Sequence, residues 1–139
     1  MANLKRKYRP IKTGYGFLAG RDCIYLDDVS FLGGTYRLRL SGEINKSLVS
    51  EPPESSEGFI PYELIFSGVL ALKVIELDSW DFECESSFDE ILDSEWVASL
   101  GGKVTSANKH IFIQTYDDVF EVVCSSYKFN YLSKAQDAA

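Results

Sequence analysis

Carboxylates and aromatic rings alternate along one stretch of the chain, Val74 to Gly102, which contains neither lysine nor arginine. Carboxylates pair with arginine and lysine side chains, and an exposed tryptophan supplies the desolvated anchor that protein interfaces favour. The stretch therefore predicts a surface for a basic protein partner. Its candidate binding residues are Asp78, Trp80, Asp81, Glu83, Glu85, Asp89, Glu90, Asp93 and Trp96.

A second interpretation assigns this stretch no partner. The carboxylates would form a solvated face that keeps the protein in solution, and both tryptophans would belong to the core, where tryptophan is usually found. Both interpretations stay open, because the sequence does not show which of these side chains share one face of the fold.

The acidic residues do not predict a metal centre. No stretch has the spacing of an EF-hand calcium loop, and Asp78 to Asp81 is not a recognisable ligand set. Two carboxylates could serve a glycosidase-like hydrolase, but the separation that decides this is not visible in a sequence. A small carboxylate-based hydrolase is therefore kept as an alternative, and no catalytic residue, metal or cofactor is assigned.

The single histidine and the three cysteines are dispersed along the chain. Cys23, Cys84 and Cys124 form no CxxC or CxxH pair, which disfavours both a zinc site and a disulfide framework. A catalytic pair of His110 with Cys124 or Cys23 is formally open. However, Cys124 occupies an apolar position of an expected strand, which favours a buried and unreactive thiol.

The charge distribution argues against nucleic acid as a partner. Five of the 14 basic residues lie within the first 12 positions. Beyond Lys12, nine basic residues face 21 acidic ones, a net charge of −12 that repels a phosphate backbone. Gly14, Gly16 and Gly20 do not form a GxGxxG phosphate-binding loop, since no strand precedes them and no helix follows.

Antiparallel strands are the elements expected to position these side chains. Residues 23–31 are rich in Ile, Tyr, Val and Phe, with a break expected at Asp27–Asp28. Residues 35–42 alternate apolar and polar side chains, which is typical of a half-buried antiparallel strand. Between the two runs, Gly33–Gly34 predicts a tight turn and therefore a first hairpin.

Two further hairpins are predicted. One covers Tyr62 to Asp78, with a bulge or bend at Gly68. Its second strand, residues 70–77, carries apolar side chains on both faces, which favours a central strand covered on both sides. The other hairpin spans Lys109 to Tyr131 with a turn at Asp117–Asp118.

One short helix completes the predicted elements. Ser86 or Ser87 would cap it and Gly101–Gly102 would end it, although one irregular turn starting at Asp93 fits the pattern equally well. Strands and helices do not alternate, so a parallel sheet is not expected. The predicted fold is mainly β, with about six strands in antiparallel hairpins, arranged as a sandwich or as a strongly curved sheet with the helix on one face.

The length of 139 residues fits a single domain. We expect a basic, irregular lead-in over residues 1–20, one β-rich domain over residues 21–132 and a frayed tail over residues 133–139. A loop rich in serine and proline, residues 45–58, interrupts the strands. The basic residues near the N-terminus precede no apolar signal segment, no apolar run could span a bilayer, and unpaired cysteines suit a reducing compartment, so a cytoplasmic location is expected.

Two segments resemble a known class of proteins. The run from His110 to Val123, HIFIQTYDDVFEVV, and the run from Phe66 to Trp80 with the acidic stretch behind it are similar to parts of small bacterial immunity proteins of polymorphic-toxin systems. The resemblance covers about half of the chain. It implies a cytoplasmic protein that neutralises a cognate toxin by binding it. It transfers no site residue, because the similar motifs are structural.

Taken together, these features favour a small acidic binding protein, such as an immunity-type inhibitor of a basic partner protein. A structural or adaptor module is the first alternative, with a homodimer through an uncovered sheet edge or face as one form of it. The carboxylate-based hydrolase is the second alternative. No nucleic acid, membrane or cofactor is expected to bind.

Overall fold

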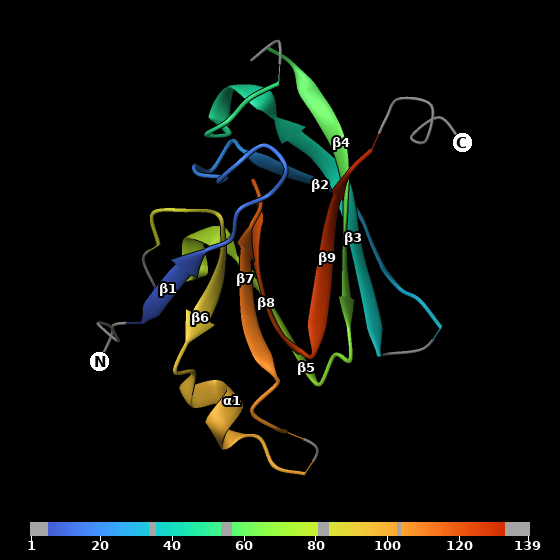
Figure 1. Ribbon diagram of the computed structural model, residues 1–139, viewed down its shortest axis with the longest axis vertical. Helices are drawn as coiled ribbons and strands as arrows, with labels where there is room; N and C mark the ends of the chain where they lie inside the picture. The colour runs from blue at the N-terminus through green and yellow to red at the C-terminus, as the bar shows by residue number, and fades with distance from the viewer. Residues whose placement is uncertain (1–5, 34–35, 54–56, 81–83, 103, 133–139) are drawn as a thin grey trace.

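Two antiparallel sheets form the fold in the computed structural model of the chain (Figure 1). The structure describes residues 6–33, 36–53, 57–80, 84–102 and 104–132. Within them, the predicted mainly β fold with one short α-helix is confirmed, with nine strands in place of about six. The elements are β1 (Lys7–Pro10), β2 (Ile24–Phe31), β3 (Arg37–Asn45), η1 (Lys46–Leu48), β4 (Phe59–Ser67), β5 (Ala71–Glu76), η2 (Leu77–Ser79), β6 (Phe88–Leu92), α1 (Glu95–Ser99), β7 (Lys109–Gln114), β8 (Asp118–Cys124) and β9 (Ser126–Tyr131).

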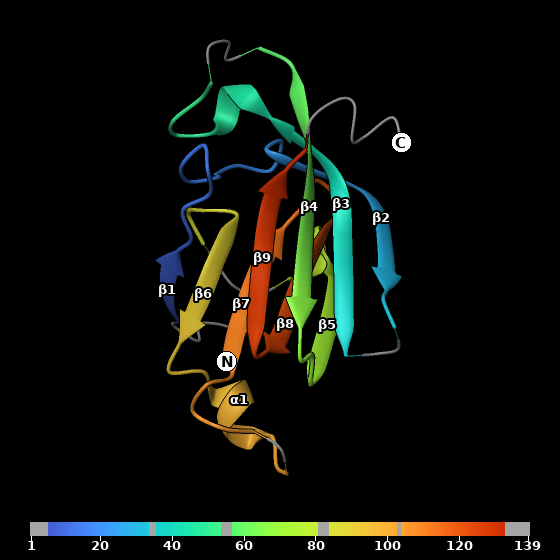
Figure 2. The same ribbon diagram turned by 45° about the vertical axis from the view of Figure 1, so that its right-hand side comes forward.

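The sheets pack face to face as a sandwich. One sheet has the strand order β2–β3–β4–β9 and the other has the order β1–β6–β7–β8–β5. Figure 2 shows the two layers side by side, with α1 at the end of the molecule beyond β6. Leu40 and Leu64 of the first sheet belong to one continuous buried cluster with Ile113 and Phe120 of the second. This shared core decides between the two architectures that the sequence left open.

The first predicted hairpin is confirmed as β2 and β3. The register between the strands shifts between Leu26 and Asp28, so the expected break is a β-bulge. The bulge brings the backbone of Tyr25 over Gly42, where an added Cβ atom would lie 2.0 Å from the Tyr25 carbonyl oxygen. Gly42 therefore has a steric role in β3, although it occupies a position where a strand would otherwise favour a side chain.

The second predicted hairpin is wrong, because β4 and β5 lie in different sheets. β4 pairs with β3 and β9, whereas β5 pairs with β8. The chain crosses between the sheets near Gly68, which has a φ of 64°. β5 is also an edge strand and not a central one. Leu72 of β5 packs against the core between the sheets, whereas Val74 is 52% exposed. The five-stranded sheet also has a second apolar cluster on its outer side, which includes Leu77 and Trp80 but no residue of β5.

Of the two predicted forms of the helix, the longer one over residues 86–100 is wrong, and the single turn starting near Asp93 is close to what the structure has. Residues 88–92 form β6, and only the single turn of α1 follows, capped by Ser94. Phe88 and Ile91 are three residues apart, a spacing that indicates one face of a helix. In a strand the same spacing places the two side chains on opposite faces, and here Phe88 lies in the core between the sheets while Ile91 lies in the outer cluster.

The N-terminal segment is more ordered than expected. Residues 7–10 were expected to be irregular, but they form β1 and pair with β6 along its whole length. Tyr8 packs edge-on against Phe112 and so ties β1 to the outer apolar cluster. The expected tail at residues 133–139 lies outside the described residues. No helix in the described part of the chain is long and apolar enough to cross a membrane.

Candidate functional site

The basic strand β1 neutralises part of the acidic stretch. Lys7 Nζ lies 3.1 Å from Asp93 Oδ2, and Arg9 Nη2 lies 2.5 Å from Glu90 Oε1. Both ion pairs arise because β1 pairs with β6. This pairing places the basic residues of β1 beside acidic residues in β6 and directly after it. Glu90 and Asp93, two of the predicted binding residues, therefore already have partners within the molecule.

Two other predicted binding residues pack into the fold, Trp80 as a partly buried residue and Asp89 as a buried one. The Trp80 ring stacks on Phe112 at a centroid distance of 4.8 Å, and its Nε1 donates a hydrogen bond to Glu121 Oε2 at 2.9 Å. Asp89 is only 1% exposed and accepts a hydrogen bond from the Ser86 hydroxyl. Burial raises the pKa of Asp89 above its ordinary value. Trp80 thus packs on the outer side of the five-stranded sheet, and Asp89 is held within the fold.

The remaining members of the predicted set do not form one surface either. Trp96 on α1 meets the His110 ring edge-on, and Lys73 Nζ lies 4.2 Å from the Trp96 ring centroid. Glu85 and Asp78 are exposed. Asp81 and Glu83 lie outside the described residues. The described members are therefore distributed among ion pairs, buried packing and separate exposed positions.

A different group of residues brings carboxylates and aromatic rings together. Tyr116 stacks on Tyr25 at a centroid distance of 5.2 Å, and Phe59 meets Tyr25 edge-on at 5.5 Å. The backbone N–H of Tyr116 donates to the Ile24 carbonyl at 2.9 Å, which fixes the turn between β7 and β8 beside the start of β2. We define the acidic–aromatic face as Asp22, Tyr25, Phe59, Glu76, Asp78, Tyr116 and Asp117.

The carboxylates of this face come from three separate connections. The Leu77 N–H donates to the Asp117 carbonyl at 3.0 Å, so η2 and the β7–β8 turn lie side by side. Glu76 accepts hydrogen bonds from the backbone N–H of Asp78 and the hydroxyl of Ser79, which lower its pKa and keep it ionised. On the other side, partial desolvation and the Asp22 carboxylate raise the pKa of Tyr25.

Arg21 contacts both Tyr116 and Asp78 of the acidic–aromatic face. Its Nε donates to the Tyr116 carbonyl at 3.1 Å, its guanidinium lies 5.1 Å from the Tyr116 ring centroid, and its Nη1 lies 3.9 Å from Asp78 Oδ1. These contacts hold Tyr116 in place while leaving 39% of the residue exposed. A rigid, exposed aromatic ring beside ionised carboxylates suits the recognition of a basic protein surface.

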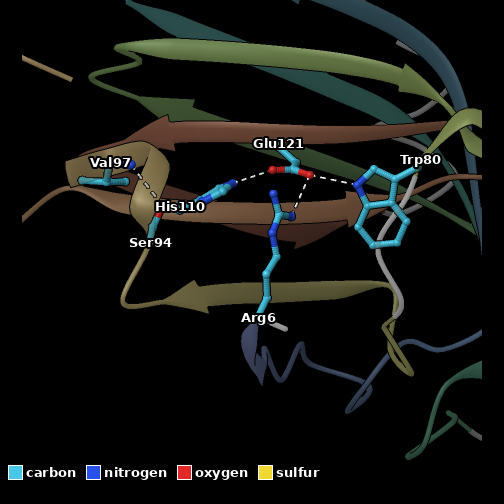
Figure 3. A network of polar contacts seen from close by, with 6 residues as sticks. All are labelled: Arg6, Trp80, Ser94, Val97, His110 and Glu121. Carbon is cyan, nitrogen blue, oxygen red and sulfur yellow. Dashed lines mark hydrogen bonds and ion pairs between the residues drawn. The ribbon is translucent and has the colours of Figure 1, made fainter. Parts of the chain in front are cut away.

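A buried network of polar side chains lies on the outer side of the other sheet (Figure 3). Glu121 is fully buried on β8, and its Oε2 accepts hydrogen bonds from Arg6 Nη1 and Trp80 Nε1, both at 2.9 Å. Its Oε1 lies 2.7 Å from His110 Nε2. The other ring nitrogen, His110 Nδ1, lies 2.7 Å from the Ser94 hydroxyl. The network connects Arg6 of the N-terminal segment to Trp80, Ser94, His110 and Glu121.

Glu121 is ionised in this network despite its burial. Desolvation alone would raise its pKa, but the hydrogen bonds from His110, Arg6 and Trp80 outweigh that effect and lower the pKa to about 2. An ionised carboxylate only accepts hydrogen bonds, so His110 donates from Nε2. When the ring is neutral, its Nδ1 must therefore accept a hydrogen bond from the Ser94 hydroxyl.

A pocket of about 510 Å³ opens beside the Ser94 end of the network. Apolar walls from β6 and α1 include Ile91 and Trp96, and the cations Arg6 and Lys73 also line it.

Comparison with protein-family models, curated proteins and solved structures finds no match for this chain. Its chemistry is therefore inferred from its own geometry.

The geometry removes the proposed pairing of a cysteine with His110. Cys23 and Cys124 are fully buried in the core between the sheets, whereas His110 points to the opposite side of its sheet and is hydrogen-bonded at both nitrogens. Desolvation raises the thiol pKa to about 11 for Cys23 and about 12 for Cys124, so neither forms a thiolate readily. Within the described residues, no group of His, Cys, Asp and Glu side chains is arranged to hold a metal ion.

Sequence reasoning did not identify Ser94, Glu121 or Arg6 as members of a site. Arg6 and Glu121 are 115 positions apart, and Ser94 and Glu121 approach His110 from different elements. One signal was available: Glu121 is a charged residue in the apolar run VFEVVC of an expected strand. A charged residue at a buried strand position requires a partner, and the single histidine was a candidate.

The network makes a prediction about pH and stability. The pKa of Glu121 is lower in the folded state than its ordinary value of 4.5, so its contribution should be complete above about pH 4.5 and should be lost as the pH falls toward 2. We expect the difference in unfolding free energy between the wild type and Glu121→Gln to shrink over this range. Urea denaturation of both proteins at several pH values measures that difference. Asp89, whose raised pKa acts with the opposite sign, is present in both proteins and cancels.

A difference that stays constant down to pH 2 would contradict this assignment. It would mean that the carboxylate of Glu121 has no lowered pKa in the folded state, and that its hydrogen bonds from Arg6, Trp80 and His110 do not favour the ionised form.

Proposed function

We propose that the protein binds a basic partner protein through the acidic–aromatic face, as an immunity-type inhibitor would. The observation that carries the proposal is the exposed stack of Tyr116, Tyr25 and Phe59 bordered by carboxylates. Tyr116 and Phe59 are 39% and 47% exposed, so their rings offer apolar area that a partner can desolvate.

The rigidity of this face favours binding. A tyrosine anchor loses little conformational entropy when its ring is already held in place, and Tyr116 is in contact with both Arg21 and Tyr25. The face therefore needs little rearrangement before it meets a partner. A loop of solvated carboxylates, by contrast, would lose more conformational freedom on binding.

Charge complementarity determines the kind of partner that we propose. The face carries the carboxylates of Asp22, Glu76, Asp78 and Asp117 around one guanidinium, and the chain beyond Lys12 is strongly acidic. Such a field accelerates association with a basic protein, and added salt weakens the effect. The resemblance of residues 110–123 to immunity proteins of polymorphic-toxin systems supports a toxin as the basic partner.

The test begins with capture of a partner at low salt from the organism that encodes the chain. The captured protein is then purified, and its affinity for the wild type and for variants is measured by calorimetry at low and high salt. We expect a basic protein whose affinity falls with salt. Tyr116→Ala should weaken binding about 30-fold, corresponding to about 2 kcal/mol for the loss of a central aromatic anchor.

Charge reversal on and off the face provides the matched control. Asp117→Lys and Glu95→Lys change the net charge equally, and both positions are exposed, but Glu95 lies on α1 outside the face. Asp117→Lys should weaken binding about tenfold or more, and Glu95→Lys should change it much less. Equal effects of the two reversals, a partner that is not basic, or the absence of a partner would each overturn the proposal in favour of a structural module.

A further inference from the structure

The polar network ends at a serine hydroxyl beside the pocket. Ser94 Oγ lies 2.7 Å from His110 Nδ1, and His110 Nε2 lies 2.7 Å from Glu121 Oε1. Figure 3 shows these residues in one line from the interior of the sheet to the start of α1. A hydroxyl, an imidazole and a carboxylate joined in this order are the groups that activate a serine for nucleophilic attack.

The proton arrangement supports that chemistry. Because Glu121 accepts from Nε2, the Nδ1 lone pair of a neutral His110 faces Ser94. The Val97 N–H donates to Ser94 Oγ at 3.1 Å and so occupies one of the two lone pairs of the hydroxyl oxygen. The Ser94 proton is therefore directed to the imidazole. The ring nitrogens have exchanged roles relative to the serine proteases, where Nε2 faces the serine.

The surroundings hold this arrangement in place. Arg6 and Trp80 fix the far oxygen of Glu121, and the Trp96 ring meets the His110 ring edge-on at a centroid distance of 5.1 Å. His110 is 2% exposed, yet its ring lines the pocket together with Ser94. The general base is therefore shielded from bulk water, while the hydroxyl it contacts is only partly buried.

The pocket indicates the substrate class. Ile91, Leu92 and Trp96 provide an apolar wall for a short acyl chain, and the volume of about 510 Å³ suits a small molecule and not a polymer chain. Arg6 and Lys73 line the same pocket, so it carries positive charge that favours the anion formed during ester hydrolysis.

We propose that Ser94 is the nucleophile of an esterase site for small carboxylic esters, with His110 as general base and Glu121 as a positioning residue. As the bond from Ser94 Oγ to the acyl carbon forms, the hydroxyl proton moves to His110 Nδ1. The bond to the alcohol oxygen then breaks, and His110 returns the proton to that alcohol. Water next attacks the acyl-serine, with its proton passing through His110 to Ser94, and the carboxylic acid leaves.

Two measurements on the 139-residue chain test this site. A fluorophosphonate probe, which forms a covalent bond to activated serines with loss of fluoride, should label Ser94, as identified by mass spectrometry of the peptide. Hydrolysis of 4-nitrophenyl acetate should follow saturation kinetics. Absence of the adduct at Ser94 in folded protein, or hydrolysis no faster than in buffer alone, would overturn the proposal.

The variants separate the chemical role of Ser94 from its role as a helix cap. Ser94→Asn keeps a side chain that caps α1 well but removes the hydroxyl. It should remain folded, lose the label and hydrolyse the ester about 100-fold more slowly. Ser99→Ala removes an exposed hydroxyl from the end of the same helix and should behave like the wild type. Equal labelling of Ser94→Asn would show that another residue reacts.

A third variant tests the positioning role of Glu121. Glu121→Gln should lower kcat about 100-fold and leave KM for 4-nitrophenyl acetate unchanged, since Glu121 does not touch the substrate. The comparison is made at a temperature where circular dichroism shows the variant to be folded. A folded variant with unchanged kcat would show that the carboxylate has a structural role only.

Discussion

Replacing Glu121 with alanine is expected to lower the free energy of unfolding by about 4 kcal/mol. Arg6 and His110 would be left in a buried site without the negative charge that faces them, and the Trp80 N–H would lose its acceptor. Removing one partner of a buried ion pair costs more than the pair contributes, because the remaining charge is not solvated. Urea denaturation at neutral pH, followed by far-UV circular dichroism, measures the loss.

The exposed pair of Lys7 and Asp93 provides the matched control for this prediction. Both side chains are about three-quarters exposed, so Asp93→Ala should change stability by less than about 1 kcal/mol. Hydrogen exchange adds a local readout, because β1 should lose protection in Glu121→Ala before the other strands do. If both variants lose the same small amount of stability, Glu121 does not connect the N-terminal segment to the sheet.

Replacing Gly42 with alanine is expected to destabilise the protein by about 3 kcal/mol. The new methyl group would lie 2.0 Å from the carbonyl oxygen of Tyr25 and 3.0 Å from the backbone nitrogen of Asp27. Both contacts are with backbone, so the bulged part of β2 has to move and cannot simply choose another rotamer. Thermal and urea denaturation measure the loss.

The same substitution is expected to disturb the acidic–aromatic face, since Tyr25 carries the central ring of its stack. Gly101→Ala is the control, because nothing lies within 4 Å of the added atom and its φ is not in the left-handed region. It should be neutral, or stabilising by up to about 1 kcal/mol. A Gly42→Ala protein as stable as the wild type would mean that the backbone of the bulge is not in close steric contact with position 42 of β3.

The strands whose alternation has a single buried face were predictable from the sequence. β3 shows this, because its apolar residues face the core while its arginines face outward. The partners of the strands were not predictable by the same means. β4 and β5 are close in sequence and both strand-like, yet Gly68 turns the chain into the other sheet, and local pattern does not distinguish a hairpin from such a crossing.

A second apolar cluster explains the other errors. β6 was interpreted as helix because its apolar residues point to both sides of the five-stranded sheet, and both sides are covered. β1 was interpreted as irregular because four residues rich in positive charge have no visible periodicity. Its order comes from contacts with residues that lie about 80 to 115 positions further along the chain.

The candidate site was only partly predictable for a similar reason. The sequence predicted a site of carboxylates and aromatic rings, and the acidic–aromatic face has both, but the prediction took proximity in sequence as proximity in space. Asp78 is the described residue of the predicted set that lies on the acidic–aromatic face. The other members of the face come from the loop before β2, from β2, β4 and β5, and from the β7–β8 turn. Only the sandwich topology brings Tyr25, Phe59 and Tyr116 together.

The position of β1 has a consequence for the chain as it is being synthesised. β1 is synthesised before its neighbour β6, which follows about 80 residues later, and the carboxylate that binds Arg6 follows about 115 residues later. Until then, β1, which contains lysine, tyrosine and arginine, has no partner strand in this fold. The five-stranded sheet can be completed only after β8 has been translated, so this fold should depend on chaperones that protect early strands more than a fold built from neighbouring hairpins would.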